Sequence, residues 1–235
     1  MTRPSLTELA HRFGSDKGAR KHRYTQLYDV LFAPYRDQPI TFMEMGLLIG
    51  GPEHGKPAGR ATSDAPSVRM WLDYFTRAQV IGLDASDFSW LEHERFRFVG
   101  CDMDDRGEIR QAAAVSDALD IIIDDASHAS AHQQHGLLEF FPRLVPGGMY
   151  IIEDLQWQPP VYENRRPGFT RTAPLLWNFV RTGKFSHSDP ELEGELNGLA
   201  GDIDGCFIFQ KNYDKARRDK LAVIRKRAGG RGDGG

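Results

Sequence analysis

The sequence is poor in the features that mark several protein classes. Two cysteines in 235 residues are too few for a disulfide scaffold. Lysine and arginine number 30 against 33 acidic residues, so no basic face for nucleic-acid phosphates is expected. No apolar run approaches the roughly 20 residues that span a bilayer, and Met1–Gly14 lacks the apolar core of a signal peptide. We therefore expect a cytoplasmic globular protein without a nucleic-acid or membrane partner.

Two phosphate-binding motifs are also missing. Residues 46–51 read GLLIGG, which does not match the G-x-G-x-x-G dinucleotide fingerprint, and no G-x-x-x-x-G-K-[ST] loop is present. Asp84 follows Gly46 by 38 positions, whereas the fingerprint places its acid about 20 positions on. A nicotinamide-dependent oxidoreductase is therefore an alternative rather than the leading hypothesis. A nucleoside ligand without a pyrophosphate fits better, and S-adenosylmethionine is the common example.

Short apolar runs alternate with amphipathic stretches from residue 40 onward. The expected strands cover 40–43, 79–83, 96–99, 119–123 and 149–152, with a closing pair at 206–209 and 221–224. The expected helices cover 68–75, 107–115, 129–141, 174–181 and 190–199. Strand–helix alternation predicts a parallel sheet covered on both faces. The expected fold class is α/β, a Rossmann-like, doubly wound, mostly parallel sheet of about seven strands with a C-terminal antiparallel pair.

The chain is expected to form one domain over residues 1–228. Its first 36 residues form a helical cap of two helices, the first opened by a capping box between Ser5 and Glu8 and the second covering 25–33. The segment 229–235 is glycine-rich and is expected to be flexible.

Two long segments interrupt the alternation of strands and helices. The segment 50–66 contains four glycines and three prolines, a density that excludes helix or strand. The segment 156–172 contains three prolines together with Trp157, Tyr162 and Phe169. Long loops in compact domains are often functional lids. We expect 156–172 to be a lid over the acceptor.

Acidic residues follow each of the five expected parallel strands. They are Glu44, Asp84, Asp102, the pair Asp124-Asp125 and the pair Glu153-Asp154. Ligands of open α/β sheets bind at the carboxyl ends of the strands. Gly46 would let a ligand approach the backbone, Asp84 would hold ribose hydroxyls, and Asp102 could accept from an adenine amine.

The last two acidic pairs predict a metal site. Ends of neighbouring strands lie about 4.8 Å apart, and carboxylates that close repel unless they are protonated or neutralised by a cation. Oxygen ligands select a hard ion, Mg²⁺ above all. His128, three residues past Asp125, suits a general base beside the metal.

Two other interpretations of this region stay open. Asp124 and Ser127 could simply cap the following helix, as such residues commonly do. His128, His132 and His135 have the spacing i, i+4, i+7, so on one helix they would share a face and could bind zinc.

Five motifs in order carry a family resemblance: Gly14–Lys17, Tyr24–Tyr28, Ser67–Trp71, Ile123–His128 and Ile152–Leu155. The chain resembles the metal-dependent class I methyltransferases that O-methylate macrolide sugars, of the mycinamicin type, over about residues 6–155. The resemblance implies Asp125, Glu153 and Asp154 as Mg²⁺ ligands and His128 as the base. It places around S-adenosylmethionine the residues Thr25, Glu44, Gly46, Ser67, Asp84, Asp102 and Met103.

The chain departs from that family pattern at three points, since residues 46–51 include bulky side chains, the insertion up to Pro66 is unusual in content, and Ala126 replaces a glycine. The leading hypothesis is an S-adenosylmethionine-dependent, Mg²⁺-assisted O-methyltransferase acting on a small-molecule hydroxyl, on a sugar of a glycosylated natural product. A non-catalytic binding protein on the same fold is a further alternative. The sequence leaves a homo-oligomer open.

Overall fold

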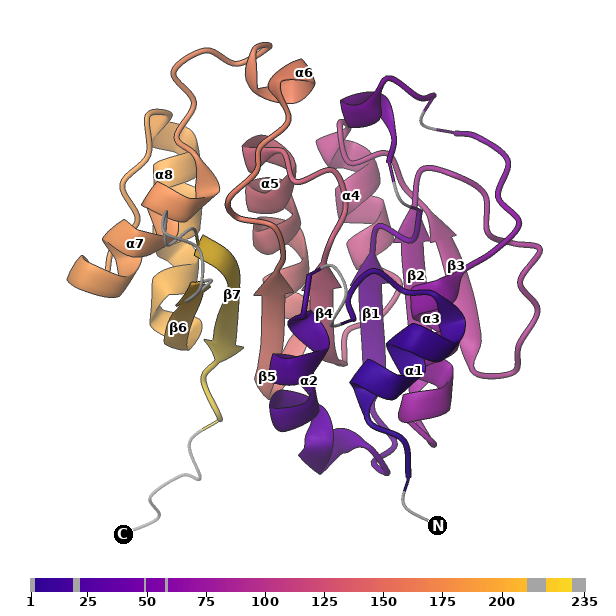
Figure 1. Ribbon diagram of the computed structural model, residues 1–235. Coiled ribbons are helices and arrows are strands. Elements are labelled where there is room, and N and C mark those ends of the chain that lie inside the picture. Colours follow the sequence, from indigo (N-terminus) through magenta and orange to yellow (C-terminus); the bar gives the residue numbers. More distant parts are fainter. Residues whose placement is uncertain (1–2, 19–21, 49, 58, 211–218, 230–235) are drawn as a thin grey trace, which may run out of the picture.

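The computed structural model describes residues 3–18, 22–48, 50–57, 59–210 and 219–229. Seven strands form one sheet in the order β3-β2-β1-β4-β5-β7-β6 (Figure 1). Their bounds are β1 Thr41–Met45, β2 Gln79–Asp84, β3 Phe96–Gly100, β4 Leu119–Asp124, β5 Leu144–Ile152, β6 Ile203–Gln210 and β7 Asp219–Lys226. Strands β1 to β5 pair in parallel, and β7 pairs antiparallel with both β5 and β6. The expected fold class is confirmed, including the antiparallel C-terminal pair.

Helices cover both faces of the sheet. One face packs against α1 (Leu6–Phe13), α2 (Tyr24–Phe32) and α3 (Pro66–Tyr74), which lie in front of it in Figure 1. The other face packs against α4 (Arg106–Ala113), α5 (Ser130–Phe140), α7 (Thr172–Thr182) and α8 (Pro190–Leu199).

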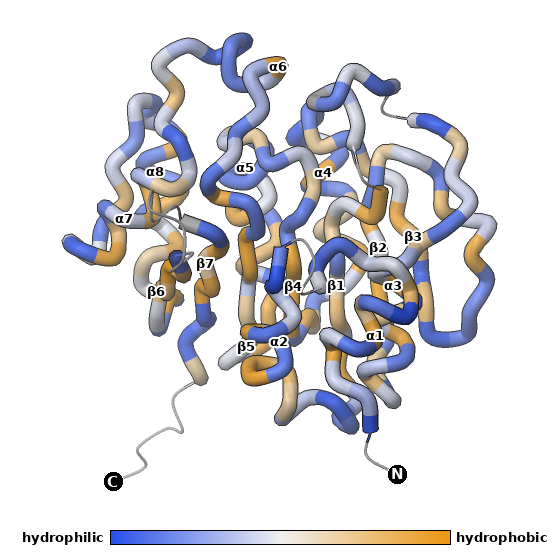
Figure 2. Tube along the Cα trace, in the orientation of Figure 1, coloured by the Kyte–Doolittle hydropathy of each residue, from blue (hydrophilic) through white to orange (hydrophobic). Residues whose placement is uncertain are grey.

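Alternation within the strands explains this two-sided core. In β4, Ile121 and Ile123 point to the α1–α3 face while Ile122 points to the α4–α5 face, because successive strand side chains point to opposite sides. All three isoleucines are fully buried. In Figure 2 the apolar residues accordingly concentrate on the strands, while the connecting loops are mostly hydrophilic.

The N-terminal helices follow their local signals. Ser5 Oγ accepts a hydrogen bond from the Glu8 backbone N–H at 3.2 Å, and the Glu8 carboxylate accepts one from the Ser5 N–H at 2.8 Å. The expected capping box is therefore present. Gly14, with φ of +78°, ends α1 in the left-handed conformation that favours glycine.

The two long segments are less irregular than expected. In 50–66, Pro52–His54 forms a 3₁₀ turn, η2, so the expectation of no helix there is wrong for these residues. Proline at the first position sets φ for such a turn, and Gly55 closes it at φ of +70°. In 156–172, Pro160–Glu163 forms the short helix α6, which lies above the carboxyl ends of the parallel strands in Figure 1.

The remaining expectations concern the chain ends and the membrane. Of the segment 229–235, residues 230–235 lie outside the described residues, so its flexibility stays a prediction. Within the described ranges, every helix is too short or too polar to cross a bilayer.

Candidate active site

Two adjoining cavities lie at the point where the strand order reverses, between β1 and β4, the place where open α/β sheets bind ligands. Both are lined by Gly46, Leu48, Gly50 and Ala126, which makes them parts of one cleft. With the open solvent at their mouths included, the space in the first is about 590 Å³ and in the second about 950 Å³.

Gly46 is the residue that opens this cleft. It follows β1 with φ of +85°, and a Cβ there would lie 2.2 Å from the backbone oxygen of Asp125. Its own N–H donates to the Leu83 oxygen at 2.8 Å, so the turn is held between β2 and the loop after β4. No side chain fits at this position, so at Gly46 the cleft is lined by bare backbone.

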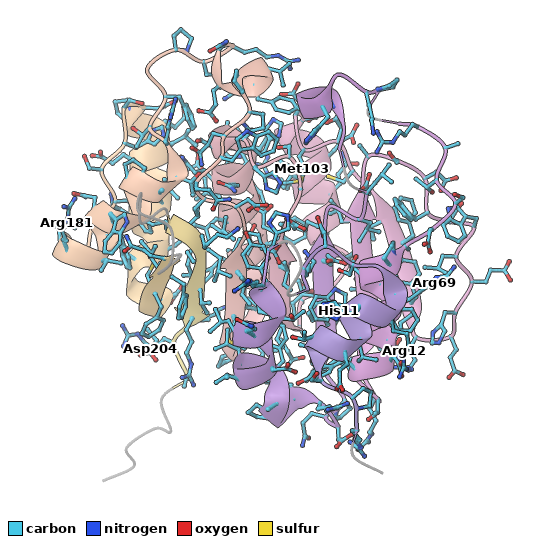
Figure 3. The ribbon with its side chains drawn as sticks, viewed as in Figure 1. His11, Arg12, Arg69, Met103, Arg181 and Asp204 are labelled. Atoms are coloured by element: carbon cyan, nitrogen blue, oxygen red, sulfur yellow. The ribbon has the colours of Figure 1, made fainter. Side chains whose placement is uncertain are left out.

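Three of the expected cofactor residues, Asp84, Asp102 and Met103, line the first cavity together. Asp84 Oδ2 accepts from the backbone N–H groups of Leu47 at 2.8 Å and Leu48 at 3.2 Å, and Oδ1 accepts from Ser86 N–H at 2.7 Å. Burial raises the pKa of Asp84, and these hydrogen bonds oppose the shift. The side chain of Met103 is labelled in Figure 3 and is buried.

The second cavity holds an acidic cluster around His128. One side-chain atom each from Asp125, His128 and Asp154 lies within 4.8 Å of the others, a group that could hold a metal ion. His128 Nε2 lies 4.0 Å from Asp125 Oδ1 and 3.9 Å from Asp154 Oδ2. His128 and Asp154 adopt φ of +59° and +51°, a conformation that costs energy in residues other than glycine. Such strain concentrates at functional sites.

Asp154 has one oxygen anchored and the other directed to His128. Its Oδ1 accepts from Tyr24 OH at 2.5 Å and Gln156 Nε2 at 2.6 Å. Burial alone would raise its pKa, but the nearby His128 and His22 and the Tyr24 hydrogen bond bring the pKa of Asp154 below its usual value. Asp154 therefore favours its ionised form, which suits a metal ligand.

Glu153 lies deeper than its neighbour. Its side chain is 1% exposed, and Oε1 accepts from Tyr28 OH at 2.5 Å. Lys17 Nζ contacts Oε1 at 3.1 Å and Oε2 at 3.0 Å. Burial and the charge of Asp125 raise the pKa of Glu153 well above its usual value. Each carboxylate oxygen has two lone pairs, so these bonds leave acceptor capacity for a further ligand.

Three other predicted cofactor residues lie on the α2–α3 side of the site. Ser67 lines the second cavity and donates its hydroxyl to Glu44 Oε2 at 2.7 Å. Glu44 itself is fully buried, and Thr25 is buried with its hydroxyl 2.8 Å from that of Thr7. Among the described residues, neither Glu44 nor Thr25 lines the two cavities. Any role they have in cofactor binding is indirect in this structure.

The three histidines do not share a helical face. α5 begins at Ser130, after His128, so the expectation that all three lie on one helix is wrong. His132 instead contacts Ser127 Oγ through Nδ1 at 2.6 Å and Asp104 Oδ1 through Nε2 at 3.1 Å. Of these histidines, only His128 is part of the metal-competent group found among the described residues. Asp124 does not cap α5 either, because the N-cap residue of α5 is Ala129 and has no side-chain cap; Asp124 accepts instead from Ala126 N–H at 3.4 Å and from Tyr150 OH at 3.0 Å.

Comparison with known proteins gives this geometry a context. No family model matches the chain. The chain is 40% identical over 96% of its length to the 8-demethyl-8-alpha-L-rhamnosyl tetracenomycin-C 2′-O-methyltransferase of Streptomyces olivaceus, of which it spans 55%. It is 36% identical over 65% of its length to the mycinamicin VI 2″-O-methyltransferase of Micromonospora griseorubida, of which it spans 36%.

The solved structures agree. The MycE methyltransferase from the mycinamycin biosynthetic pathway, in complex with Mg, SAH and mycinamycin VI, superimposes with a TM-score of 0.71 at 27% identity. That match covers 99% of this chain and 57% of the other. The chain is a homologue of natural-product sugar O-methyltransferases. The resemblance expected from its motifs is confirmed, and the chain spans about half the length of the curated relatives that match most of it.

This methyltransferase homologue also has site residues to which the sequence analysis gave no role. Lys17, Tyr24 and Tyr28 supply donors to Asp125, Glu153 and Asp154 from the N-terminal segment. All three residues lie within the motifs Gly14–Lys17 and Tyr24–Tyr28, so their presence in those motifs was the available signal. Their contacts are long-range and could not be read from local pattern.

The expected lid is anchored over the first cavity. Arg165 Nη1 donates to Asp104 Oδ2 at 2.6 Å, and the Ser130 backbone N–H donates to Glu163 Oε1 at 2.7 Å. Tyr162 lines the first cavity, with its ring 4.8 Å from that of His132.

The other two lid aromatics lie apart from Tyr162. Trp157 lines the second cavity, with its ring 5.5 Å from that of His128 and 5.4 Å from that of His54. Phe169 packs against His187 instead. Two of the three lid aromatics therefore border the cleft.

Proposed function

We propose that this chain is an S-adenosylmethionine-dependent, Mg²⁺-assisted O-methyltransferase that acts on a sugar hydroxyl of a glycosylated natural product. One observation carries the proposal: a cavity lined by Asp84 and Asp102 adjoins a strained acidic cluster with a histidine at the switch point of the sheet. The names of the homologues support it, since they describe sugar O-methyltransferases, and MycE was solved with Mg and SAH.

The residues present fit both groups. Carboxylate oxygens of Asp125 and Asp154 converge on one point, and hard oxygen donors suit Mg²⁺. At the other end, Gly46 has no room for a side chain, and Asp84 is oriented by three backbone N–H groups beside the first cavity. We assign Asp125, Glu153 and Asp154 to the metal, Asp84 to the ribose, and Asp102 with Met103 to the adenine.

His128 is the proposed general base. When bound, S-adenosylmethionine presents an electrophilic methyl group, and Mg²⁺ lowers the pKa of a nearby acceptor hydroxyl. His128 lines the second cavity, and its Nε2 faces the space between Asp125 and Asp154. It can therefore accept the hydroxyl proton as the acceptor oxygen attacks the methyl carbon and the carbon–sulfur bond breaks. Asp125 and Asp154 flank the imidazole and stabilise the imidazolium that forms.

The chain's remaining contribution is positioning and exclusion of water. Trp157 and Tyr162 border the cleft from the lid, and closing a site in this way increases the strength of its electrostatic interactions. Holding two reactants in line removes much of the entropic barrier to a transfer between them. We expect no nucleic-acid or membrane partner, a cytoplasmic location, and a homo-oligomer as a possible assembly.

The direct test is a mass-spectrometric search for a gain of one methyl group on rhamnosylated tetracenomycin-type glycosides, with S-adenosylmethionine and Mg²⁺. We expect methylation that stops in EDTA while S-adenosylhomocysteine binding persists. Full turnover in chelator would refute the metal-assisted mechanism. A thermal shift with NADH and none with S-adenosylhomocysteine would favour the oxidoreductase. Binding of S-adenosylhomocysteine without transfer to any glycoside would favour a non-catalytic protein.

A second test separates the roles of His128 and Glu153. The group in the structure that could hold a metal consists of Asp125, His128 and Asp154, whereas the resemblance implies Glu153 as the third ligand and His128 as the base. We expect His128→Gln to abolish transfer and to leave Mg²⁺ affinity, measured by calorimetry, within about threefold of the parent. Glu153→Gln should weaken Mg²⁺ at least tenfold. The reverse pattern would make His128 the ligand and Glu153 a supporting carboxylate.

A further inference from the structure

Lys17 is the most unusual residue of the N-terminal segment. It lies between α1 and α2, yet it is only 1% exposed, and lysine is almost never fully buried unless it is paired. Its backbone oxygen accepts from the Thr25 N–H at 3.1 Å, which ties the segment to the start of α2. The long side chain then runs inward to the carboxyl ends of the strands.

The Lys17 ammonium meets carboxylates from three different parts of the sheet. Its Nζ lies 2.5 Å from Asp125 Oδ2, 3.0 Å from Glu153 Oε2 and 3.4 Å from Glu44 Oε1. These carboxylates come from the loop after β4, the residue after β5 and the last part of β1. Carboxylates that share a buried site repel one another unless they are protonated or a cation lies among them. In this structure Lys17 is that cation.

The contact also orients Asp125. Oδ2 is taken by Lys17, and Oδ1 is left to face His128 Nε2 at 4.0 Å. Asp154 shows the same division, since Tyr24 and Gln156 bind its Oδ1 and its Oδ2 faces His128. Lys17 and Tyr24 thus each bind one oxygen of a carboxylate, and the other oxygen of that carboxylate is left to bind a metal.

We propose that Lys17 is a resident cation of the carboxylate cluster, which holds Glu44, Asp125 and Glu153 together without a metal and turns Asp125 Oδ1 toward the metal position. It is a positioning residue, because it acts through the carboxylates and not on substrate. The consequence is that the donor set exists before any metal binds. A further consequence is that the ammonium charge lowers the affinity for a divalent cation, since both cations act on the same carboxylates.

The test compares Lys17→Met with Lys226→Met as a matched control. Lys226 also makes two short hydrogen bonds, at 2.7 Å each, but to the backbone oxygens of Pro142 and Leu144, and it lines neither cavity in the described part of the chain. Thermal unfolding of each variant is followed in excess EDTA and in millimolar MgCl₂. Calorimetry with MgCl₂ alone gives the affinity.

We expect Lys17→Met to lower the Tm in EDTA by about 10 °C, because three buried carboxylates lose their cation. Mg²⁺ should restore more than half of that loss and should bind at least tenfold more tightly than to the parent, because a competing charge is gone. Lys226→Met should respond to Mg²⁺ like the parent. A merely structural lysine would lower the Tm without changing the Mg²⁺ response.

Two outcomes would overturn the proposal. One is a Tm of Lys17→Met in EDTA close to that of the parent. The other is an equal rise in Tm on addition of MgCl₂ for Lys17→Met and for the parent. If Lys17→Met does not fold in EDTA, the double variant Lys17→Met/Glu153→Gln removes one charge of each sign and should regain a folding transition. Failure to do so would also refute the idea. The inference rests on the proposed function only for the identity of the cation. Methyl transfer is not measured, so inactivity toward every glycoside would refute the function and leave this result standing.

Discussion

A substitution of Gly46 by alanine tests the geometry of the cleft floor, and Gly147 provides a matched control. The two glycines have nearly the same conformation, with φ of +85° and +84°. At Gly147 a Cβ meets nothing within 4 Å, whereas at Gly46 it would lie 2.2 Å from Asp125 O and 2.6 Å from Ala126 Cα. The difference between the two variants therefore isolates the steric effect from the backbone effect.

The expected magnitudes follow from these distances. Gly147→Ala costs only the left-handed backbone, about 1–2 kcal/mol. In Gly46→Ala the backbone of Asp125 must also retreat by about 1 Å in a closely packed interior, although its N–H is bonded to the Met45 oxygen at 2.9 Å. We expect a total of about 4 kcal/mol, which is large for a single substitution.

The assays are urea denaturation for the free energy of unfolding and calorimetry with S-adenosylhomocysteine for the cofactor site. Gly147→Ala should leave the cofactor affinity unchanged, and Gly46→Ala should lower it at least tenfold, because the floor shared by both cavities moves. Equal losses of stability in the two variants, with equal cofactor affinity, would show that the contact between the two loops does not constrain this turn.

Three further predictions concern the surroundings of the cleft. Burial lowers the pKa of His135 to about 4, so between about pH 6.5 and pH 4 the unfolded chain takes up a proton that the folded chain does not. The free energy of unfolding of the parent should therefore fall between pH 7 and pH 5 by about 2 kcal/mol more than that of His135→Phe. Urea denaturation at both pH values measures the difference. Asp84→Asn should lower the affinity for S-adenosylhomocysteine about tenfold. Both oxygens of Asp84 accept hydrogen bonds from backbone N–H groups, whereas the amide nitrogen of asparagine cannot accept one. An unchanged affinity would contradict the ribose assignment. Arg165→Met should speed tryptic cleavage within 156–172 with a Tm change below about 3 °C, since exposed ion pairs contribute at most about 1 kcal/mol. Arg143→Met, which breaks another exposed pair far from the lid, should leave that cleavage rate unchanged.

The strands were predictable because their signal is local. The run Leu119–Ile123 is apolar at almost every position, as buried parallel strands are, and the structure places β4 there with only one added residue. β5 shows the limit, because it begins at Leu144 and not at Met149. Pro146, Gly147 and Gly148 mask its first half, although the register shift between β4 and β5 accommodates them.

The site was predictable where chemistry follows strand ends, and not where it depends on tertiary contacts. The acids after β4 and β5 converge because parallel strands end at the same edge. His128 lies in the loop before α5, in agreement with the expected helix at 129–141, and its positive φ could not be read from the sequence because the fold imposes it. The burial of Lys17 has no local signal, because it depends on residues more than a hundred positions away.

The anchoring of the acidic cluster by segments far apart in sequence has a consequence for biosynthesis. Lys17 and Tyr24 bind the cluster from α2 and the segment before it, and Lys220, on β7, lies 3.7 Å from Asp154. β7 also separates β5 from the edge strand β6, so this sheet stays incomplete until β7 has left the ribosome. Contacts of such sequence separation form slowly. A nascent chain stalled before residue 219 would therefore expose the edge of β5, the kind of unpaired strand that chaperones protect.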